Sequence, residues 1–504
     1  MRRLSSLLLA VLLTGCASSA VLSPPAAVLP QTAWSGPEVA EVGGQMRFDW
    51  WLALESPELN RLVEDALRVN HDLAEARANL RVAQALAGQA RSLSWPQGDV
   101  SAQVERTREP ALAQPPVPGA PDRFPSQTLG GIAGHLAWEL DLAGGLAATA
   151  RAAEADAEAA LWQRRGMEAA VAAQVVRAWL DLGRSTDLIR LSERRRATLG
   201  KAVAFLERRQ AHGAASEADV AAMRRLQADS MAEGPALDQA RNNALRRLAV
   251  LTAQDPVAFV RDRAALSGAA ATPGTLFAPD PIAMLRQRPD VLAAERRLEA
   301  SYERAGVARA ALYPSLSLSV GAGRLADPGD LLEPGALRFA VGPSVSWGLF
   351  NLRRLNAGIR AADAAREAAA AQWAKTILTA LEEADGALDA WRAARATAYS
   401  SRSAASQAEV QAAAMRARAS VGAATALDLA LAEAALLSAQ AASAGAGVAE
   451  RMAWAEAHLA LGAGWTPQDA PVAGWNTRQA PPSITPAGSP EGMAYTRAER
   501  GISP

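Results

Sequence analysis

Cysteine is almost absent from this chain, since Cys16 is the only one among 504 residues. A single thiol cannot close an internal disulfide, so no disulfide framework is expected within the chain. A catalytic thiol would need a folded neighbourhood that lowers its pKa. Cys16 instead comes directly after a short apolar run near the N-terminus. This position indicates processing of the chain and not catalysis.

Recognisable catalytic motifs and a net charge are also lacking. The sequence contains no H-E-x-x-H, no G-x-x-x-x-G-K-[ST], no G-x-S-x-G and no paired-cysteine metal spacing. Its four histidines, His71, His135, His212 and His458, are scattered. Lys+Arg and Asp+Glu both number 52, whereas a nucleic-acid partner would require a basic surplus. We therefore expect no enzyme, no metal site, no nucleic-acid partner and no cofactor other than a covalent lipid.

Long apolar runs are missing after residue 15, so no transmembrane helix is expected there. If this chain crosses a membrane, it must therefore do so as a closed β-barrel. Half of the residues are hydrophobic, much of that share is alanine, and aromatic residues make up only 5%. Alanine-rich sequence with interspersed charges favours long helices that pack closely.

The N-terminal residues have the layout of a secretory signal. The letters MRR are followed by a mostly apolar stretch over residues 4–13, which is too short to span a bilayer permanently. The letters LLTGC at 12–16 resemble the bacterial lipobox, in which the cysteine is lipidated, commonly with palmitate, and the chain is cut before it. This predicts a signal peptide over 1–15 and a lipidated tether over 16–45 that begins at Cys16. The alternative is an ordinary signal peptide with an incidental cysteine.

The chain repeats itself. The letters HDLAEARANLRVAQALAGQARSLSWP at 71–96 align without a gap with PDVLAAERRLEASYERAGVARAALYP at 289–314, which lies 218 positions later. A second alignment places Gly213 on Gly422, and Trp138 on Trp347, at a separation of 209 positions. Chance similarity between alanine-rich helices is the alternative, but it does not easily place glycine, proline and tryptophan in register.

The duplication divides the chain. We predict a first structural repeat, a linker, a second repeat and a partly disordered C-terminal tail, over residues 46–256, 257–280, 281–465 and 466–504. Each repeat begins with a helix, which Pro96 or Pro314 is expected to end. Each also contains a long stretch without proline, at 146–212 and at 352–421.

These two stretches are long enough for very long helices. At 1.5 Å per residue, roughly 65–70 helical residues reach about 100 Å. Gly213 and Gly422 interrupt the pattern, and each is followed by Ser or Thr and then by Asp, which indicates a turn and a helix start. The sequence therefore predicts two long helical hairpins that pack in coiled-coil fashion.

Four segments alternate between apolar and small or polar residues, at 99–106, 132–141, 315–323 and 337–349. Alternation over roughly this length is typical of membrane strands, although a half-buried soluble sheet is the alternative. Four strands cannot close a barrel, and open edges are not tolerated in lipid, so a spanning chain must oligomerise. Two copies would give a small filled barrel, and three would give twelve strands around an open lumen.

Several segments together carry a family resemblance. They are LVEDALRVNHDLAEARANL at 62–80, WELDLAGGL at 138–146, RLAVLTAQDP at 247–256 and, most specifically, LRQRPDVLAAERRLEASYERAGVARAALYPSLSLS at 285–319. From about residue 34 to 465 the chain resembles the TolC-like outer-membrane factors, most closely the lipoprotein branch often called NodT-type efflux channels. Ala253 stands where family members often have glycine.

The resemblance implies a mainly α fold with a membrane β part. Three chains would form a twelve-stranded barrel continued by a helical tunnel across the periplasm, anchored by lipid in the outer membrane. The implied function is the exit duct of a tripartite efflux system, passively exporting small molecules passed on by an inner-membrane transporter and a periplasmic adaptor protein. Alternatives are an exit duct for type I protein secretion and a helical adaptor lipoprotein that does not span the membrane.

The closed end of such a duct is expected at the hairpin tips. Asp219 and Asp428 lie just beyond them and, repeated by threefold symmetry, would ring the bore as a periplasmic gate. The alternative is that both are exposed acids favourably placed at helix starts. The basic and acidic residues that some relatives carry at the second tip are replaced by Ala424 and Leu431. The tip residues that resemble the family's adaptor-contacting motif are Gly213, Val421, Gly422 and Ala423.

Overall fold

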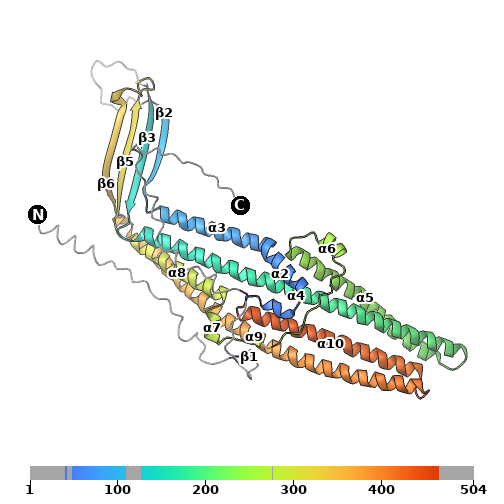
Figure 1. The fold of residues 1–504 in the computed structure, drawn as a ribbon. Coiled ribbons are helices and arrows are strands. Elements are labelled where there is room, and N and C mark those ends of the chain that lie inside the picture. The colour runs from blue at the N-terminus through green and yellow to red at the C-terminus, as the bar shows by residue number, and fades with distance from the viewer. Residues whose placement is uncertain (1–33, 35–39, 42–47, 109–125, 275, 465–504) are drawn as a thin grey trace, which may run out of the picture. The chain divides into compact units, whose positions relative to one another are not determined.

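The computed structural model describes residue 34 and residues 40–41, 48–108, 126–274 and 276–464. The predicted signal peptide, Cys16 and the tail over 466–504 lie outside these residues. Within them the chain consists of long helices and a four-stranded sheet (Figure 1), together with a short two-stranded pairing. This agrees with the predicted mainly α fold with a β part.

The two repeats have the same order of elements. The first contains α2 (Pro57–Val69), α3 (His71–Ser92), β2 (Gln97–Arg108), β3 (Ser126–Leu140), α4 (Gly145–Ala211) and α5 (Glu217–Leu251). The second contains α7 (Pro281–Leu285), α8 (Pro289–Ala310), β5 (Ser315–Ala326), β6 (Leu337–Ser346), α9 (Leu352–Ser420) and α10 (Ala426–Ala460). The short elements outside this pattern are β1 (Ala40–Glu41), η2 (Trp50–Leu54), α6 (Pro256–Asp262), β4 (Leu276–Phe277), η4 (Pro334–Ala336) and η5 (Leu349–Asn351).

The predicted long helices are α4 and α9, with 67 and 69 residues. Both are free of proline and rich in alanine, which has the best intrinsic helix propensity and allows close approach of a neighbouring helix. One expectation was wrong in detail, because α3 and α8 end at Ser92 and Ala310, four residues before Pro96 and Pro314. A short turn separates each helix from the proline, which instead precedes the first residue of a strand.

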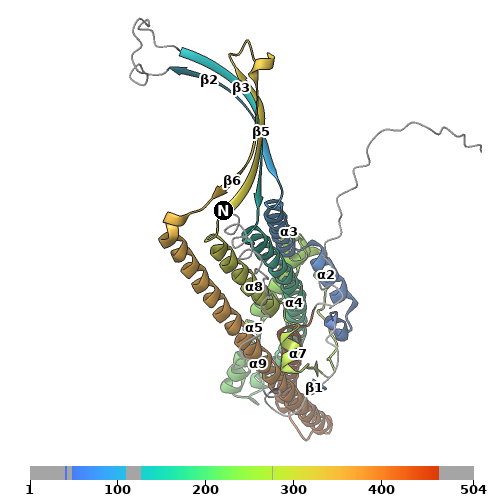
Figure 2. The ribbon, with the colours of Figure 1, turned by 90° about the vertical axis from the view of Figure 1, so that its left-hand side faces the viewer.

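The four predicted alternating segments form one antiparallel sheet in the order β2-β3-β5-β6 (Figure 2). The register places Ile132 of β3 between Ala102 of β2 and Arg324 of β5, and Arg324 opposite Leu337 of β6. Among the described residues β2 and β6 each pair on one side only. The sheet therefore has two open edges.

The helices next to the sheet continue the order of the strands. α3 packs along α4, α4 along α8, and α8 along α9, and these four helices connect directly to β2, β3, β5 and β6 in that order. Towards the hairpin tips the row becomes α5, α4, α10 and α9, because α5 packs on α4, α4 on α10, and α10 on α9. Within the described part of the chain, a row of four elements with two open sides thus runs through both the helices and the sheet.

The main hydrophobic core lies where α2, α4, α5, α9 and α10 meet. Its largest buried side chains include Trp50, Trp179, Trp391 and Trp454, and small residues such as Ala380 are buried among them. Small and large side chains together can fill the space between helices at the density typical of protein interiors. A second, smaller core near the first hairpin tip joins α4 and α5 to Ala430 of α10.

The segment expected as a linker, 257–280, is held against α4. The indole of Trp179 donates a hydrogen bond to the carbonyl of Ala269 at 2.9 Å. The Gly183 and Gly268 backbones approach so closely that a Cβ on Gly183 would lie 2.3 Å from the Gly268 carbonyl oxygen. The Trp34 indole, from the range expected as a tether, donates to Pro279 O at 2.7 Å.

Candidate functional site: the sheet faces, the hairpin tips and a buried arginine

One face of the sheet is apolar and exposed. Side chains alternate in a strand, and the paired register brings the apolar residues of all four strands to the same side. The exposed fractions of Phe339 and Val100 are 81% and 78%. A monomeric soluble protein rarely exposes a contiguous patch of this kind. The further exposed members of this face are Val104, Ile132, Leu136, Trp138, Val320, Leu337, Val341 and Val345.

The opposite face carries small and polar residues. One line across the sheet runs through Ser101, Ala133, Gly323 and Arg338, and the neighbouring lines contain His135 and several serines and glycines. This face can border water, whereas the apolar face can border lipid. The alternation predicted from the sequence therefore holds across all four strands and not only within each one.

Two tryptophans mark the helical end of the apolar face in equivalent ways. The Trp138 indole donates to Ser94 O at 2.9 Å, and the Trp347 indole donates to Leu312 O at 3.0 Å. Both pairs obey the offsets of the duplication, 209 for the tryptophans and 218 for the carbonyls. An amphipathic ring with its N–H satisfied is the side chain typical of a membrane–water boundary.

The hairpin tips are two copies of one turn. Gly213 and Gly422 adopt φ values of 69° and 73°, a conformation that glycine adopts without strain. The next residue in each tip closes the helix end, since the amides of Ala214 and Ala423 bond the carbonyls of Arg209 and Arg418, both at 2.8 Å. This is the Schellman arrangement.

The next helix begins with the same cap at both tips. Ser216 and Asp219 form a capping box at the start of α5, and Thr425 and Asp428 form one at the start of α10. Hydrogen bonds from the hydroxyl and the backbone N–H of Ser216 lower the pKa of Asp219. The same groups of Thr425 lower the pKa of Asp428, with a smaller contribution from Arg418.

Within one chain, both aspartates therefore serve as helix-start acids and are exposed to solvent. The tip residues Val421, Gly422 and Ala423 are also exposed, with Val421 at 78%. A gate ring would require copies of the chain around an axis, so the gate and the adaptor contact stay predictions. The structure shows these residues together at the hairpin ends, as the sequence indicated.

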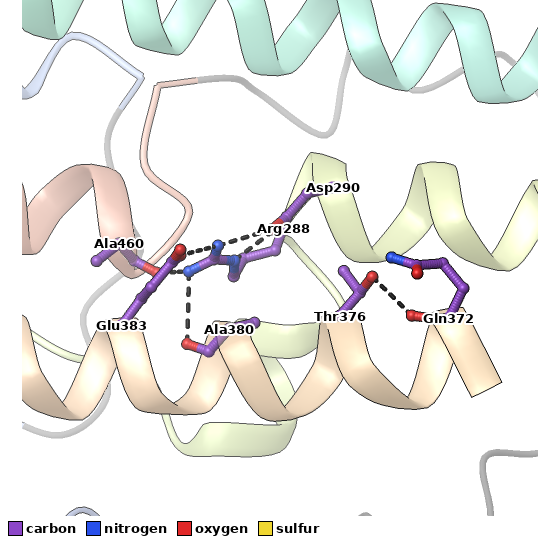
Figure 3. A network of polar contacts seen from close by, with 7 residues as sticks. All are labelled: Arg288, Asp290, Gln372, Thr376, Ala380, Glu383 and Ala460. Atoms are coloured by element: carbon purple, nitrogen blue, oxygen red, sulfur yellow. Dashed lines mark hydrogen bonds and ion pairs between the residues drawn. The ribbon is translucent and has the colours of Figure 1, made fainter.

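A buried arginine near the start of α8 was missed as an individual site, although it lies in the most specific segment of the resemblance. The Arg288 side chain is 8% exposed and reaches two other helices (Figure 3). Its Nη1 donates to Ala460 O at 2.7 Å and to Ala380 O at 3.4 Å. Its Nη2 donates to Glu383 at 2.6 Å, and the guanidinium also binds Asp290 through two nitrogens.

The Arg288 network joins α8 to the middle of α9 and the end of α10 (Figure 3). Burial alone would lower the pKa of Arg288, but the hydrogen bonds and charges of Asp290 and Glu383 outweigh it and hold this pKa above its ordinary value. The charge is therefore permanent. The only signal in the sequence was the R-P-D spacing, which shows an acid within reach but does not reveal the two carbonyls.

The described part of the chain also has a groove away from the sheet and the hairpin tips. A groove of about 650 Å³ between α4 and α5 is lined by Arg177, Asp181, Arg184 and Arg247, among others. Burial raises the pKa of Asp181, while Arg177 and Arg184 act against that rise. No group of three or more His, Cys, Asp or Glu side chains among the described residues is placed to hold a metal ion.

The comparisons with known proteins agree with this architecture. The model of the family described as "Outer membrane efflux protein" matches residues 62–254 and 282–463, which is most of the chain. The chain belongs to the outer membrane efflux protein family. The two matched ranges lie within the two repeats, and the gap between them contains the whole linker.

Two curated relatives of this chain come from Pseudomonas. The outer membrane protein OprJ of Pseudomonas aeruginosa is 28% identical over 77% of this chain and 80% of its own length. The toluene efflux pump outer membrane protein TtgF of Pseudomonas putida is 28% identical over 67% of this chain and 69% of its own. Both relatives are outer membrane proteins, and TtgF is the outer membrane protein of a toluene efflux pump.

Solved structures show the same fold. The outer-membrane channel OprN superposes with a TM-score of 0.76 at 28% identity, covering 86% of this chain and 98% of its own. The outer membrane protein VceC of Vibrio cholerae superposes with a TM-score of 0.71 at 26% identity, covering 84% of this chain and all of its own. The chain is thus an outer-membrane efflux channel protein.

Proposed function

We propose that three copies of this chain close into one duct, which carries small molecules passively through the outer membrane. The observation that carries this proposal is the row of four elements with open sides in both the sheet and the helices. An unpaired strand edge cannot face lipid, so β2 of one copy would pair with β6 of the next. Three copies would give twelve strands, enough for an open lumen.

The exposed surface of α10 supports the same assembly. Among the described helices, α10 is the one whose length and composition would allow it to cross a membrane, yet only 17% of its apolar window is buried within the chain. α10 packs along α9 and α4 as one arm of a hairpin, and its Glu450 pairs with Arg402 at 3.1 Å. We infer that neighbouring copies cover its alanine-rich surface.

The remaining parts of the proposal concern the two ends of the duct and its anchor. The tip residues Gly213, Val421, Gly422 and Ala423 would meet a periplasmic adaptor protein, which links the duct to an inner-membrane transporter. Copies of Asp428, with Asp219, would narrow the bore there. Cys16 would carry the lipid that adds an anchor in the outer membrane.

The assembly is tested by native mass spectrometry of the full chain in mild detergent. A mass of three chains is expected, together with conducting pores when the same sample is placed in a planar bilayer. A conducting sample whose mass is that of one or two chains would contradict the trimer.

The anchor is tested separately by metabolic labelling with a fatty acid. Cys16→Ser should abolish labelling, while a trimer should still form because the strands are themselves a membrane anchor. Labelling that persists in this variant would show that Cys16 is not the acylated residue.

A further inference from the structure

Two arginines lie on the apolar face of the sheet, near its loop end. Side chains alternate along β2, so Arg106 shares the face of Val100 and Val104. Arg324 of β5 shares the face of Ile132 and Leu337, with which it is in register. Charged residues on a lipid-facing surface are costly unless they reach a boundary or a partner.

The two arginines are equivalent members of the duplication. Arg106 and Arg324 are 218 positions apart, the same offset that relates the first strand residues Gln97 and Ser315. Each arginine therefore lies nine residues into its strand. Both copies of the repeat place an arginine at the same point of the apolar face. This recurrence indicates that the cation has a function at this position.

That position matches the far boundary of a membrane band. Nine residues at about 3.4 Å each advance roughly 30 Å along the strand, and a tilt of about 45° reduces this to roughly 22 Å along the membrane normal. The apolar band of outer-membrane barrels is about 25 Å tall. The hydrogen-bonded indoles of Trp138 and Trp347 lie at the helical end of the same face. The tryptophans and the arginines therefore lie at opposite ends of the apolar face.

Arg324 is held by the loop that follows its strand. Its Nη1 donates to Leu331 O at 3.1 Å and to Glu333 O at 3.2 Å. The same loop contains Asp327, Asp330 and Glu333, yet the described residues show no ion pair between Arg324 and a carboxylate. Backbone carbonyls orient the guanidinium without neutralising it, and they leave its Nε and Nη2 outside the described hydrogen bonds.

We propose that Arg106 and Arg324 bind the phosphate of an anionic lipid in the external leaflet of the outer membrane. A guanidinium binds phosphate through two parallel N–H groups, and neutralisation at the band edge offsets the cost of a cation beside hydrocarbon. This inference rests on the proposed membrane-spanning trimer, in which three copies would supply six such arginines. The site would fix the depth of the duct in the membrane.

The experiment is native mass spectrometry of the full chain in detergent with added lipid A, which carries two phosphates. The wild-type trimer should retain lipid A, and the double variant Arg106→Gln/Arg324→Gln should retain about tenfold less, because a charge-assisted contact is lost at each site. Arg338→Gln is the matched control, since Arg338 lies in the same sheet on the opposite, polar face. This control should bind lipid A like the wild type.

Two further arms make the outcome decisive. Monophosphoryl lipid A should bind the wild type more weakly than lipid A does, and Arg324→Lys should keep much of the binding because it keeps the charge. Equal lipid A retention by the wild type and the double variant would overturn the site, as would an equal loss in Arg338→Gln. The same spectra report the trimer mass, so failure of the assembly is seen independently of lipid binding.

Discussion

The two repeats of this chain make the same helix-to-helix contact with different side chains. In each, the residue that precedes the first sheet-side helix binds the last turn of the returning helix. Asn70 Nδ2 donates to Leu251 O at 3.0 Å in the first repeat, and Arg288 Nη1 donates to Ala460 O at 2.7 Å in the second. Residues 70 and 288 differ by 218 and residues 251 and 460 by 209, which are the offsets of the duplication.

The two contacts differ in the number of helices that each side chain binds. Asn70 is short and neutral, and its Oδ1 caps the start of α3 by accepting hydrogen bonds from the amides of Asp72 and Leu73. Arg288 also reaches Ala380 and Glu383 on α9. The first contact joins two helices, whereas the second joins three. The comparison indicates that duplication preserved a backbone contact, while substitution made the second repeat more tightly coupled.

Removing the two side chains should give the largest difference between the repeats. Arg288→Met should lower the free energy of unfolding by about 3 kcal/mol, towards the low end for breaking a buried ion pair, because Asp290 and Glu383 are about half exposed. Asn70→Ala should cost about 1–2 kcal/mol for a lost cap and a lost buried hydrogen bond. Denaturant titration of the trimer, followed by helical circular dichroism, measures both.

Amide hydrogen exchange localises the effect of each variant. Arg288→Met should increase exchange at the end of α10, and Asn70→Ala should increase it at the end of α5, so each variant is the control for the other. Equal exchange at both helix ends in both variants would show that neither side chain holds its own repeat.

Much of this fold could be predicted because its signals are local or periodic. The absence of proline over 146–212 and 352–421 gave both long helices to within a residue. Alternation located the four strands, although β3 begins six residues earlier than expected, at Ser126. The linker was harder, because its contact with α4 depends on close approach of Gly183 and Gly268 from distant parts of the chain.

The site was predictable where it depended on turns and not where it depended on assembly. Gly213 and Gly422, followed by Ser or Thr and Asp, indicated the tips, and the structure shows both capping boxes. Arg288 could not be recognised, because its carbonyl partner Ala460 is 172 residues away and any residue can supply a carbonyl. The gate depends on neighbouring copies, which no local pattern encodes.

Acid should destabilise the second repeat more than the first. His458 is buried between Trp50 and Trp454. Burial lowers its pKa to about 4, although a hydrogen bond to the Trp454 carbonyl acts in the opposite direction. Between pH 6.5 and 4 the unfolded chain binds a proton that the folded chain does not. Stability should therefore fall as the pH falls through this window, by roughly 3 kcal/mol at pH 4.

The test of this prediction is denaturant titration at pH 7 and pH 4.5. His458→Phe keeps an aromatic ring at this position and should remove this part of the pH dependence. The equivalent residue of the first repeat is Ala249, which is fully buried and does not titrate. An unchanged pH dependence in His458→Phe would assign it to other groups.

The tip aspartates should differ in conductance and not in stability. Asp219→Ala and Asp428→Ala each remove one member of a capping box, so both should loosen a helix start to a similar extent. Because hydrogen bonds lower both pKa values, each carboxylate contributes its stability above pH 3.8, and this contribution fades as the pH falls further.

Only a gate residue should also change the pore. We expect Asp428→Ala to weaken block by divalent cations in single-channel recordings, with Asp219→Ala as the matched comparison. Identical conductance and block in the wild type and Asp428→Ala would leave Asp428 as a helix-start acid and place the gate elsewhere.

The smallest expected effects on stability come from the residues just beyond the ends of α5 and α10. Ala253 and Gly462, 209 positions apart, both adopt positive φ, at 53° and 86°. The amides that follow them close the same turn, from Gln254 to Ala249 O at 2.8 Å and from Ala463 to His458 O at 2.9 Å. Alanine in this conformation is strained by about 1 kcal/mol, whereas glycine is not.

Exchanging the two residues should therefore have opposite effects. Ala253→Gly should raise the free energy of unfolding by somewhat less than 1 kcal/mol, because relief of strain is partly offset by the greater freedom of glycine in the unfolded chain. Gly462→Ala should lower it by about 1–2 kcal/mol, since its new Cβ would also lie 3.1 Å from Arg288 Cγ. If the Arg288 side chain adjusts freely, the two effects should be nearly equal in size. A larger loss of unfolding free energy in Gly462→Ala, accompanied by faster amide exchange at the end of α10, would instead show that Arg288 needs a glycine here to keep its position.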